Sequence, residues 1–256
     1  MVILEEFDPD HSAIIDPPHV SFPDGFFPDT AISCFTPGMF RTLLLDICGG
    51  SGQPAVFTTG IGIPVYFGIY KGKKLAFYQS PVGAPACAAV LEDIYAMGAG
   101  KVIVFGTCGV LDRNIPDGSV IIPDSALRDE GISYHYIPPS DEILLTQKYR
   151  DTFVSLLNRE EIPYTSGKVW TTDAVYRETR KKTEQRRRQG CICVDMECSA
   201  LAAVARFREK ELFQFFYAAD NLDAESWEPR SLSSERKKER KKKIAELAAE
   251  LAVLIS

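Results

Sequence analysis

The stretch that decides the fold runs from Gly98 to Gly109 and reads Gly-Ala-Gly-Lys-Val-Ile-Val-Phe-Gly-Thr-Cys-Gly. Its centre, Val102–Phe105, is a short apolar run of mostly β-branched residues. Such a run is typical of a strand that is buried on both faces of a parallel sheet. Gly98 and Gly100 precede this run and are suited to ending a helix. Gly106 and Gly109 follow it and allow a tight turn, so we expect a helix, a central strand and a turn in this order.

Strands and helices alternate on both sides of this segment. Apolar runs predict strands at Lys74–Gln79, Ser119–Pro123, Lys168–Thr172, Cys191–Met196 and Leu212–Ala219. Helices are expected over Gly83–Met97, Asp141–Asn158, Glu197–Arg208 and, from its amphipathic spacing, about 234–255. This alternation predicts an α/β fold: a single three-layer domain over residues 1–256, with a central mixed, largely parallel sheet flanked by helices. Residues 1–38, rich in Pro, Asp and Phe, are expected to form an extended N-terminal arm.

Composition narrows the class of protein. A chain of 256 residues fits one large domain, and its net charge of −6 gives no reason to expect a nucleic-acid partner. No run approaches the roughly 20 apolar residues that cross a membrane, and Met1–Glu6 lacks the basic start of a signal peptide. Seven cysteines without a Cys-x-x-Cys motif, and three histidines without metal-ligand spacing, predict reduced thiols and no metal site. We therefore expect a cytoplasmic protein that does not bind a membrane.

Two basic runs could suggest an anionic partner. Arg186–Arg188 ends an expected helix, where positive charge suits the helix dipole, and Arg236–Lys243 begins the last helix. A solvated helix face is the expected role of both runs, and contact with nucleic acid or acidic lipid is the alternative.

Three expected strands end on small or acidic residues. Thr107, Glu197 and Asp220 each follow an apolar run. In open parallel sheets a ligand lies beyond the carboxyl ends of the strands, so these side chains predict a pocket. The alternative for Thr107 is a tight strand-to-helix turn, and for Glu197 an acid stabilised by the helix dipole.

Five segments in register resemble the nucleoside phosphorylase superfamily, which contains the purine nucleoside and uridine phosphorylases. They are Ser80–Ala86 and Phe105–Gly109, which look like paired glycine signatures; Ala126–His135; Asp173–Tyr176, similar to a base-site loop; and Val194–Glu197, similar to a Glu-Met-Glu segment. The similarity runs from about Thr58 to Asp220. The fold that it implies is the phosphorylase-like α/β fold.

The resemblance also implies which residues touch the nucleoside. Met196 and Glu197 would hold the ribose, and Asp220 falls where purine-specific members have the acid that protonates the base. Residues expected at the base are Val175, Tyr176, Arg177 and Arg180. Asp195, in place of the usual glutamate, and His135 are further candidates; His135 could approach the sugar or a neighbouring pocket, and a surface or turn histidine is the alternative.

Phosphate is the co-substrate that the resemblance implies, and it implies no other cofactor. The residues expected to bind phosphate are Gly83, Thr107, Arg41 and Arg128. Val104 and Ile61, however, stand where family members usually have phosphate-binding arginines. Loss of such bidentate partners weakens phosphate binding, unless Arg128, Arg177 or Arg180 replaces them.

The expected activity is therefore phosphorolysis of a (deoxy)ribonucleoside to a free base and a (deoxy)ribose 1-phosphate. The alternatives are a nucleosidase that uses water on the same fold, and an inactive nucleoside-binding protein. Uridine-type and purine-type features are mixed, which leaves the base open. The family's sites lie between subunits, so the resemblance also implies a homo-oligomer, a dimer or a hexamer.

Overall fold

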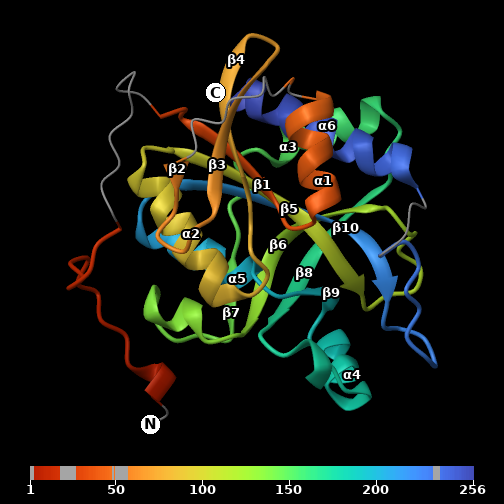
Figure 1. The fold of residues 1–256 in the computed structure, drawn as a ribbon. Helices are drawn as coiled ribbons and strands as arrows, with labels where there is room; N and C mark the ends of the chain where they lie inside the picture. The colour runs from red at the N-terminus through yellow and green to blue at the C-terminus, as the bar shows by residue number, and fades with distance from the viewer. Residues whose placement is uncertain (1–2, 18–26, 48, 50–56, 233–236) are drawn as a thin grey trace.

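A computed structural model describes residues 3–17, 27–47, 49, 57–232 and 237–256 (Figure 1). The strands are β1 (Thr30–Cys34), β2 (Phe57–Thr58), β3 (Pro64–Tyr70), β4 (Lys73–Gln79), β5 (Lys101–Val110), β6 (Val120–Asp129), β7 (Glu142–Leu144), β8 (Tyr164–Thr172), β9 (Cys191–Asp195) and β10 (Glu211–Asn221). The α-helices are α1 (Pro37–Arg41), α2 (Ala84–Ala96), α3 (Arg150–Arg159), α4 (Arg180–Arg188), α5 (Cys198–Phe207) and α6 (Lys238–Ile255). Short helical turns cover Ile3–Glu5, Thr42–Ile47, Ile132–His135 and Val175–Arg177.

Strand β5 is the centre of one mixed sheet. It pairs in parallel with β1 on one side and with β10 on the other, and β1 continues in parallel to β4. Strand β10 then turns to an antiparallel pairing with β6, which is parallel to β8, and β8 is parallel to β9. The last residues of β5 pair antiparallel with β9, so these five strands close on themselves. The expected α/β fold with a mixed, largely parallel sheet is confirmed.

Helices cover both faces of this sheet (Figure 1). Because side chains alternate along a strand, Ile32 joins a core with α1, α3 and α6, while its neighbour Ala31 joins a core with α2 and α5. Helix α4 stands apart from the other helices and contacts β9 (Figure 1).

The structure corrects three sequence expectations. The turn expected at Gly106 and Gly109 is instead the last part of β5, which continues to Val110 and stays paired with β10. The last part of the expected arm, Thr30–Cys34, is the fully buried strand β1. The sequence does not predict this strand, because its five residues lie in a proline-rich segment and show no alternation of apolar and polar residues. The expected helix at 141–158 is instead the short strand β7 followed by α3, since the apolar residues before Arg150 pair with β6. Phe22, Phe26 and His19, which also belong to the expected arm, lie outside the described residues.

A stack of three aromatic rings fills the larger core. Phe105 of β5 stacks on Phe215 of β10 with ring centroids 5.1 Å apart, and Phe153 of α3 lies 4.4 Å from Phe215. All three side chains are fully buried. These rings fix the spacing between the two strands whose ends form the site described below.

We expect Phe215→Ala to lower the free energy of unfolding by about 3–5 kcal/mol, because it leaves a cavity between β5, β10 and α3. Ile69→Ala, on a strand side chain that is 65% exposed, is the matched control and should cost far less. Urea denaturation followed by circular dichroism measures both. Equal losses in the two variants would contradict the central place of the ring stack.

Candidate functional site

The carboxyl ends of β5 and β10 meet β9 at Gly109. In the sheet, Gly109 is paired with Val194 of β9 and with Asp220 of β10. A Cβ atom at this position would collide with Leu222 and would lie 3.3 Å from Val194 Cγ1 and 3.4 Å from Asp220 Oδ1. Glycine is therefore what lets the three strands approach closely enough to share one cavity.

Two adjoining cavities open at this crossing. The inner cavity, about 260 Å³, is lined by Phe35, Val82, Thr107, Cys108, Gly109, Val175, Glu178, Val194, Asp195, Met196, Glu197, Asp220, Leu222 and Leu232. The outer cavity, about 480 Å³, is lined by Val175, Tyr176, Glu178, Arg180, Thr183, Asp220, Leu222, Ala224, Glu225, Ser226, Trp227 and Leu232. Because five residues line both, the two cavities are parts of one site.

Glu197 provides the buried carboxylate of the inner cavity. Its side chain lies just before α5, and Oε1 accepts a hydrogen bond of 2.6 Å from the backbone N–H of Gly83. Gly83 begins α2 with φ near +102°, a conformation that favours glycine. Burial, together with the negative charge of Asp195, raises the pKa of Glu197. The backbone N–H groups of Gly83 and Met196 oppose this rise.

Asp195 holds the turn that presents Glu197. Its Oδ1 accepts a hydrogen bond of 2.7 Å from the Thr171 hydroxyl, and its Oδ2 accepts bonds of 2.9 and 2.6 Å from the backbone N–H groups of Glu197 and Cys198. Burial raises the pKa of Asp195, and these three donors oppose the rise. The carboxylate therefore serves as the N-terminal cap of α5, in a region where helical N–H groups have no other partner.

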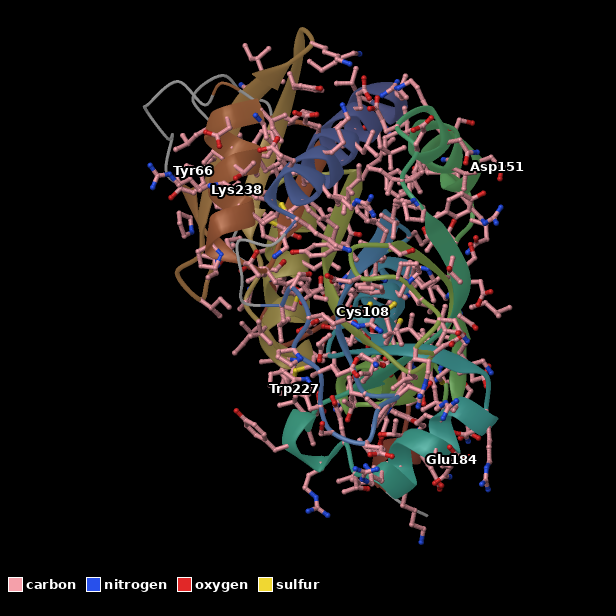
Figure 2. The ribbon with its side chains drawn as sticks, turned by 90° about the vertical axis from the view of Figure 1, so that its right-hand side faces the viewer. Tyr66, Cys108, Asp151, Glu184, Trp227 and Lys238 are labelled. Carbon is pink, nitrogen blue, oxygen red and sulfur yellow. The ribbon has the colours of Figure 1, made fainter. Side chains whose placement is uncertain are left out.

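Asp220 lies at the junction of the two cavities. Its Oδ2 accepts a hydrogen bond of 2.9 Å from the Trp227 indole N–H, which belongs to the segment after β10. Figure 2 labels Trp227 and Cys108, the latter inside the protein at the inner cavity. Burial raises the pKa of Asp220, and the Trp227 donor and the charge of Arg230 oppose the rise.

The segment after β10 is anchored from two directions. Asn221 and Glu228 exchange backbone hydrogen bonds of 2.9 and 3.2 Å, which close the segment into a hairpin-like loop. Asp223, buried at its base, accepts a 3.1 Å bond from the N–H of Arg113 and pairs with Arg187 of α4 at 2.9 Å. Trp227 is thereby held over the outer cavity.

Glu178 is a second carboxyl group at the junction, and sequence analysis did not single it out. It follows the turn Val175–Arg177, and no described residue donates a hydrogen bond to its side chain. Burial, with the charge of Asp220, raises the pKa of Glu178 to about 7. The signal that was available is its position two residues after Tyr176, at the end of the segment that resembles a base-site loop.

The other predicted residues fall into two groups. Val175, Met196 and Thr107 line the inner cavity, and Tyr176 and Arg180 line the outer one. Outside both cavities lie Arg177 and His135, which are exposed, and Arg41 and Arg128. The structure therefore brings most of the expected sugar and base residues together, but it leaves Arg177 and His135 and two expected phosphate residues outside.

Arg128 is engaged in a structural network. Its guanidinium is buried, donates hydrogen bonds of 2.8–2.9 Å to Ser133, Pro138 and Ser140, and stacks 4.1 Å from the Tyr134 ring. Arg41, at the end of α1, lines a separate cavity of about 660 Å³ together with Lys238 and Lys242. Leu232 lines both that cavity and the inner one.

The expected phosphate side of the inner cavity is apolar. Among the described residues, no lysine or arginine lines this cavity. Val104 is buried, and Ile61 is half exposed outside the site. Phe35, directly after β1, packs so closely on Gly106 that a Cβ atom there would lie 2.6 Å from its ring. An aromatic ring thus covers the part of β5 at which an anion would be expected.

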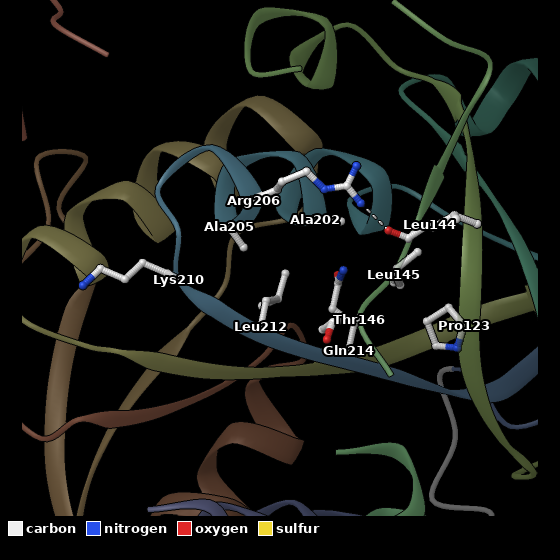
Figure 3. Close-up of a pocket in the computed structure, with 10 residues that line it drawn as sticks. All are labelled: Pro123, Leu144, Leu145, Thr146, Ala202, Ala205, Arg206, Lys210, Leu212 and Gln214. Carbon is white, nitrogen blue, oxygen red and sulfur yellow. Dashed lines mark hydrogen bonds between the residues drawn. The ribbon is translucent and has the colours of Figure 1, made fainter. Parts of the chain in front are cut away.

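A further cavity, about 330 Å³, lies between α5 and the sheet (Figure 3). Its lining residues are Pro123, Leu144, Leu145, Thr146, Ala202, Ala205, Arg206, Lys210, Leu212 and Gln214, and no carboxylate, thiol or imidazole is among them. Arg206 donates a 2.6 Å hydrogen bond to the carbonyl of Leu144, as Figure 3 shows. The group of ionisable side chains at the Gly109 crossing is therefore the candidate site.

The described parts of the chain contain no cluster of His, Cys, Asp and Glu that could hold a metal ion. The six cysteines among them are free and buried. None of the helices described is both long and apolar enough to cross a membrane.

Comparisons with known proteins agree with the fold. The sequence profile of the Phosphorylase superfamily matches residues 30–255. The chain is 27% identical to an uncharacterised protein of Acanthamoeba polyphaga mimivirus, over 77% of this chain and 78% of that one. It is 25% identical to the guanosine phosphorylase of Halorubrum lacusprofundi, over 74% and 77%. The crystal structure of purine nucleoside phosphorylase from Toxoplasma gondii in complex with immucillin-H superimposes with a TM-score of 0.76 at 17% identity, covering 95% of this chain and 99% of that one, which shows a shared fold.

We expect Asp195→Asn to lower the pKa of Glu197, because the substitution removes a neighbouring negative charge that favours the protonated form of Glu197. Carbon-13 NMR titration of labelled glutamate carboxyl groups measures this pKa directly. Asp124→Asn, on an exposed residue of β6, is the control and should leave it unchanged. A Glu197 pKa that stays the same or rises in Asp195→Asn would contradict the coupling.

Proposed function

The chain belongs to the phosphorylase superfamily, and from that premise we propose that it is a nucleoside phosphorylase, which cleaves the N-glycosidic bond of a nucleoside and transfers the pentose to phosphate. The observation that supports this most directly is the order of groups along one continuous site. A buried carboxylate, Glu197, lies in the inner cavity, and two carboxyl groups lie where that cavity joins the outer one. This arrangement fits a sugar inside and a base outside.

The inner cavity suits a pentose. The Glu197 carboxyl group can accept hydrogen bonds from sugar hydroxyls, while the Gly83 N–H holds its Oε1. Met196 supplies an apolar wall beside it. Cleavage of a glycosidic bond passes through a sugar that resembles an oxocarbenium ion, and the surrounding carboxylates stabilise its positive charge.

The outer cavity suits a planar base. Val175, Tyr176 and Trp227 provide apolar surface around it. The carboxyl groups at the junction can protonate the base as it leaves, which typically accelerates such reactions about 10²–10⁴-fold. A purine is the base that we propose, because one of the relatives is a guanosine phosphorylase and Asp220, the residue of the purine-type sequence pattern, lines the outer cavity.

A specific observation favours a second candidate, a nucleosidase that uses water. The inner cavity has apolar and acidic walls and no cation among the residues described, whereas a phosphate dianion needs positively charged or N–H donors. The Phe35 ring, which packs on Gly106, makes this side of the cavity still less suited to a phosphate dianion. Water carries no charge into such a cavity, so hydrolysis would avoid the repulsion between phosphate and carboxylates.

The mouth of the site supports a proposal of self-association. Val82, Tyr176 and Trp227 are 64%, 97% and 59% exposed at its rim, and a partner surface would cover them. We propose a homo-oligomer, a dimer or a hexamer, located in the cytoplasm. A neighbouring subunit could then supply a cation to the phosphate side.

Base release from guanosine, inosine, adenosine and uridine, each with and without phosphate, tests the proposed reaction. We expect turnover of the purine nucleosides to require phosphate and to yield ribose 1-phosphate, measured by chromatography and phosphate consumption. Equal base release in phosphate-free buffer, with free ribose as product, would establish the nucleosidase instead. No base release from any of the four would contradict both candidates.

Glu197→Gln should reduce kcat/KM at least about 10²-fold, because the neutral amide is a weaker acceptor for the sugar hydroxyls and stabilises a cationic sugar poorly. The steady-state rate on the preferred nucleoside measures this. Circular dichroism and the melting temperature of the variant serve as the control for folding. A wild-type rate in a folded variant would remove Glu197 from the site.

A further inference from the structure

The junction between the two cavities is where the bond between sugar and base must lie, if the proposed function holds. The residues that line both cavities are Val175, Glu178, Asp220, Leu222 and Leu232. Of these five side chains, only Glu178 and Asp220 can give a proton. The proton that neutralises the leaving base therefore comes from one of these two residues or reaches the base through water.

Burial raises the pKa of Asp220, but two groups oppose this rise and favour its carboxylate. Its Oδ2 accepts the indole N–H of Trp227 at 2.9 Å, a bond that favours the carboxylate. The positive charge of Arg230 acts in the same direction. The other oxygen, Oδ1, lies close to Gly109: a Cβ atom built on that glycine would be 3.4 Å from it.

Glu178 is in the opposite situation. No described residue donates a hydrogen bond or a salt bridge to its carboxyl group, which is partly buried between the two cavities and faces the charge of Asp220. Both burial and a neighbouring negative charge favour the protonated form of a carboxyl group, and they raise the pKa of Glu178 to about 7. Two nearby carboxyl groups with different surroundings commonly divide into one acid and one carboxylate.

We infer that Glu178 is the general acid that protonates the leaving base, and that Asp220, held by Trp227, is the carboxylate that keeps Glu178 protonated. This assignment rests on the proposed cleavage of a nucleoside. It gives Asp220 a positioning role in place of the acid role that its sequence position implies.

The step balances in protons and electrons. The electron pair of the C1′–N bond moves to the ring nitrogen of the base, which takes up the proton of the Glu178 carboxyl group. The oxygen of the acceptor, phosphate or water, forms the new bond to C1′. The proton that this acceptor loses restores the Glu178 carboxyl group, so the enzyme ends the cycle as it began.

A nucleoside whose base is already positively charged separates the two carboxyl groups. 7-Methylguanosine leaves without needing a proton, whereas guanosine needs one. We expect Glu178→Gln to lower kcat for guanosine about 10²–10⁴-fold and to change kcat for 7-methylguanosine less than about tenfold. Because the second substrate reports on folding and sugar binding in the same variant, a misfolded enzyme would lose both activities.

Asp220→Asn and Glu184→Gln complete the comparison. Asparagine keeps an acceptor for Trp227, so we expect Asp220→Asn to lower guanosine turnover less than Glu178→Gln does. Glu184, on the exposed side of α4 and outside both cavities (Figure 2), should tolerate glutamine with both activities unchanged.

The opposite pattern would overturn the inference: a selective loss of guanosine turnover in Asp220→Asn, with guanosine turnover retained in Glu178→Gln. Equal losses on both substrates in Glu178→Gln would overturn it too, since they would show a structural role. Failure of the wild-type enzyme to cleave either substrate would contradict the proposed function itself, and the inference would fall with it.

Discussion

The close approach of β5, β9 and β10 at Gly109 is the constraint on which the rest of the site depends. Any side chain at this position would collide with Leu222 and press against Val194. With only a hydrogen atom there, two elements far apart in the sequence deliver Glu197 and Asp220 to one cavity. The stacked rings of Phe105 and Phe215 set the spacing of β5 and β10 before they reach the crossing.

In the proposed site, the groups on the sugar side would serve both folding and chemistry. Asp195 caps α5 and so spends its acceptors on the backbone, yet its charge also acts on the neighbouring Glu197. On the base side the two tasks are divided. Asp223 ties the segment after β10 to Arg113 and Arg187, which leaves Asp220 and Glu178 to face the cavities. The Asp195 carboxylate is therefore engaged by backbone N–H groups, whereas the Glu178 carboxyl group has no hydrogen-bond donor among the described residues.

Local pattern was enough to predict the layered fold and the place of Glu197, Asp220 and Thr107. Each follows an apolar run, and the ends of parallel strands meet at one edge of a sheet. Strand β1 could not be predicted, because its five residues are buried by β4 and β5 rather than marked by their own alternation. Glu178 was missed for a similar reason: its isolation from any cation is a property of the assembled cavity. Arg128 is the converse case, since only the fold shows that Ser133, Pro138 and Ser140 occupy its guanidinium.

The position of Phe35 has a consequence for how the chemistry of such a site can change. The ring follows β1, lines the inner cavity and packs on Gly106 of β5. In the proposed site, Phe35 after β1 would determine whether phosphate or water accepts the sugar. The segment after β10 would determine which base binds, so the two selections depend on different strands. Selection can alter one without disturbing the other, so a change of acceptor needs only a few substitutions around β1 and leaves the recognition of the base intact.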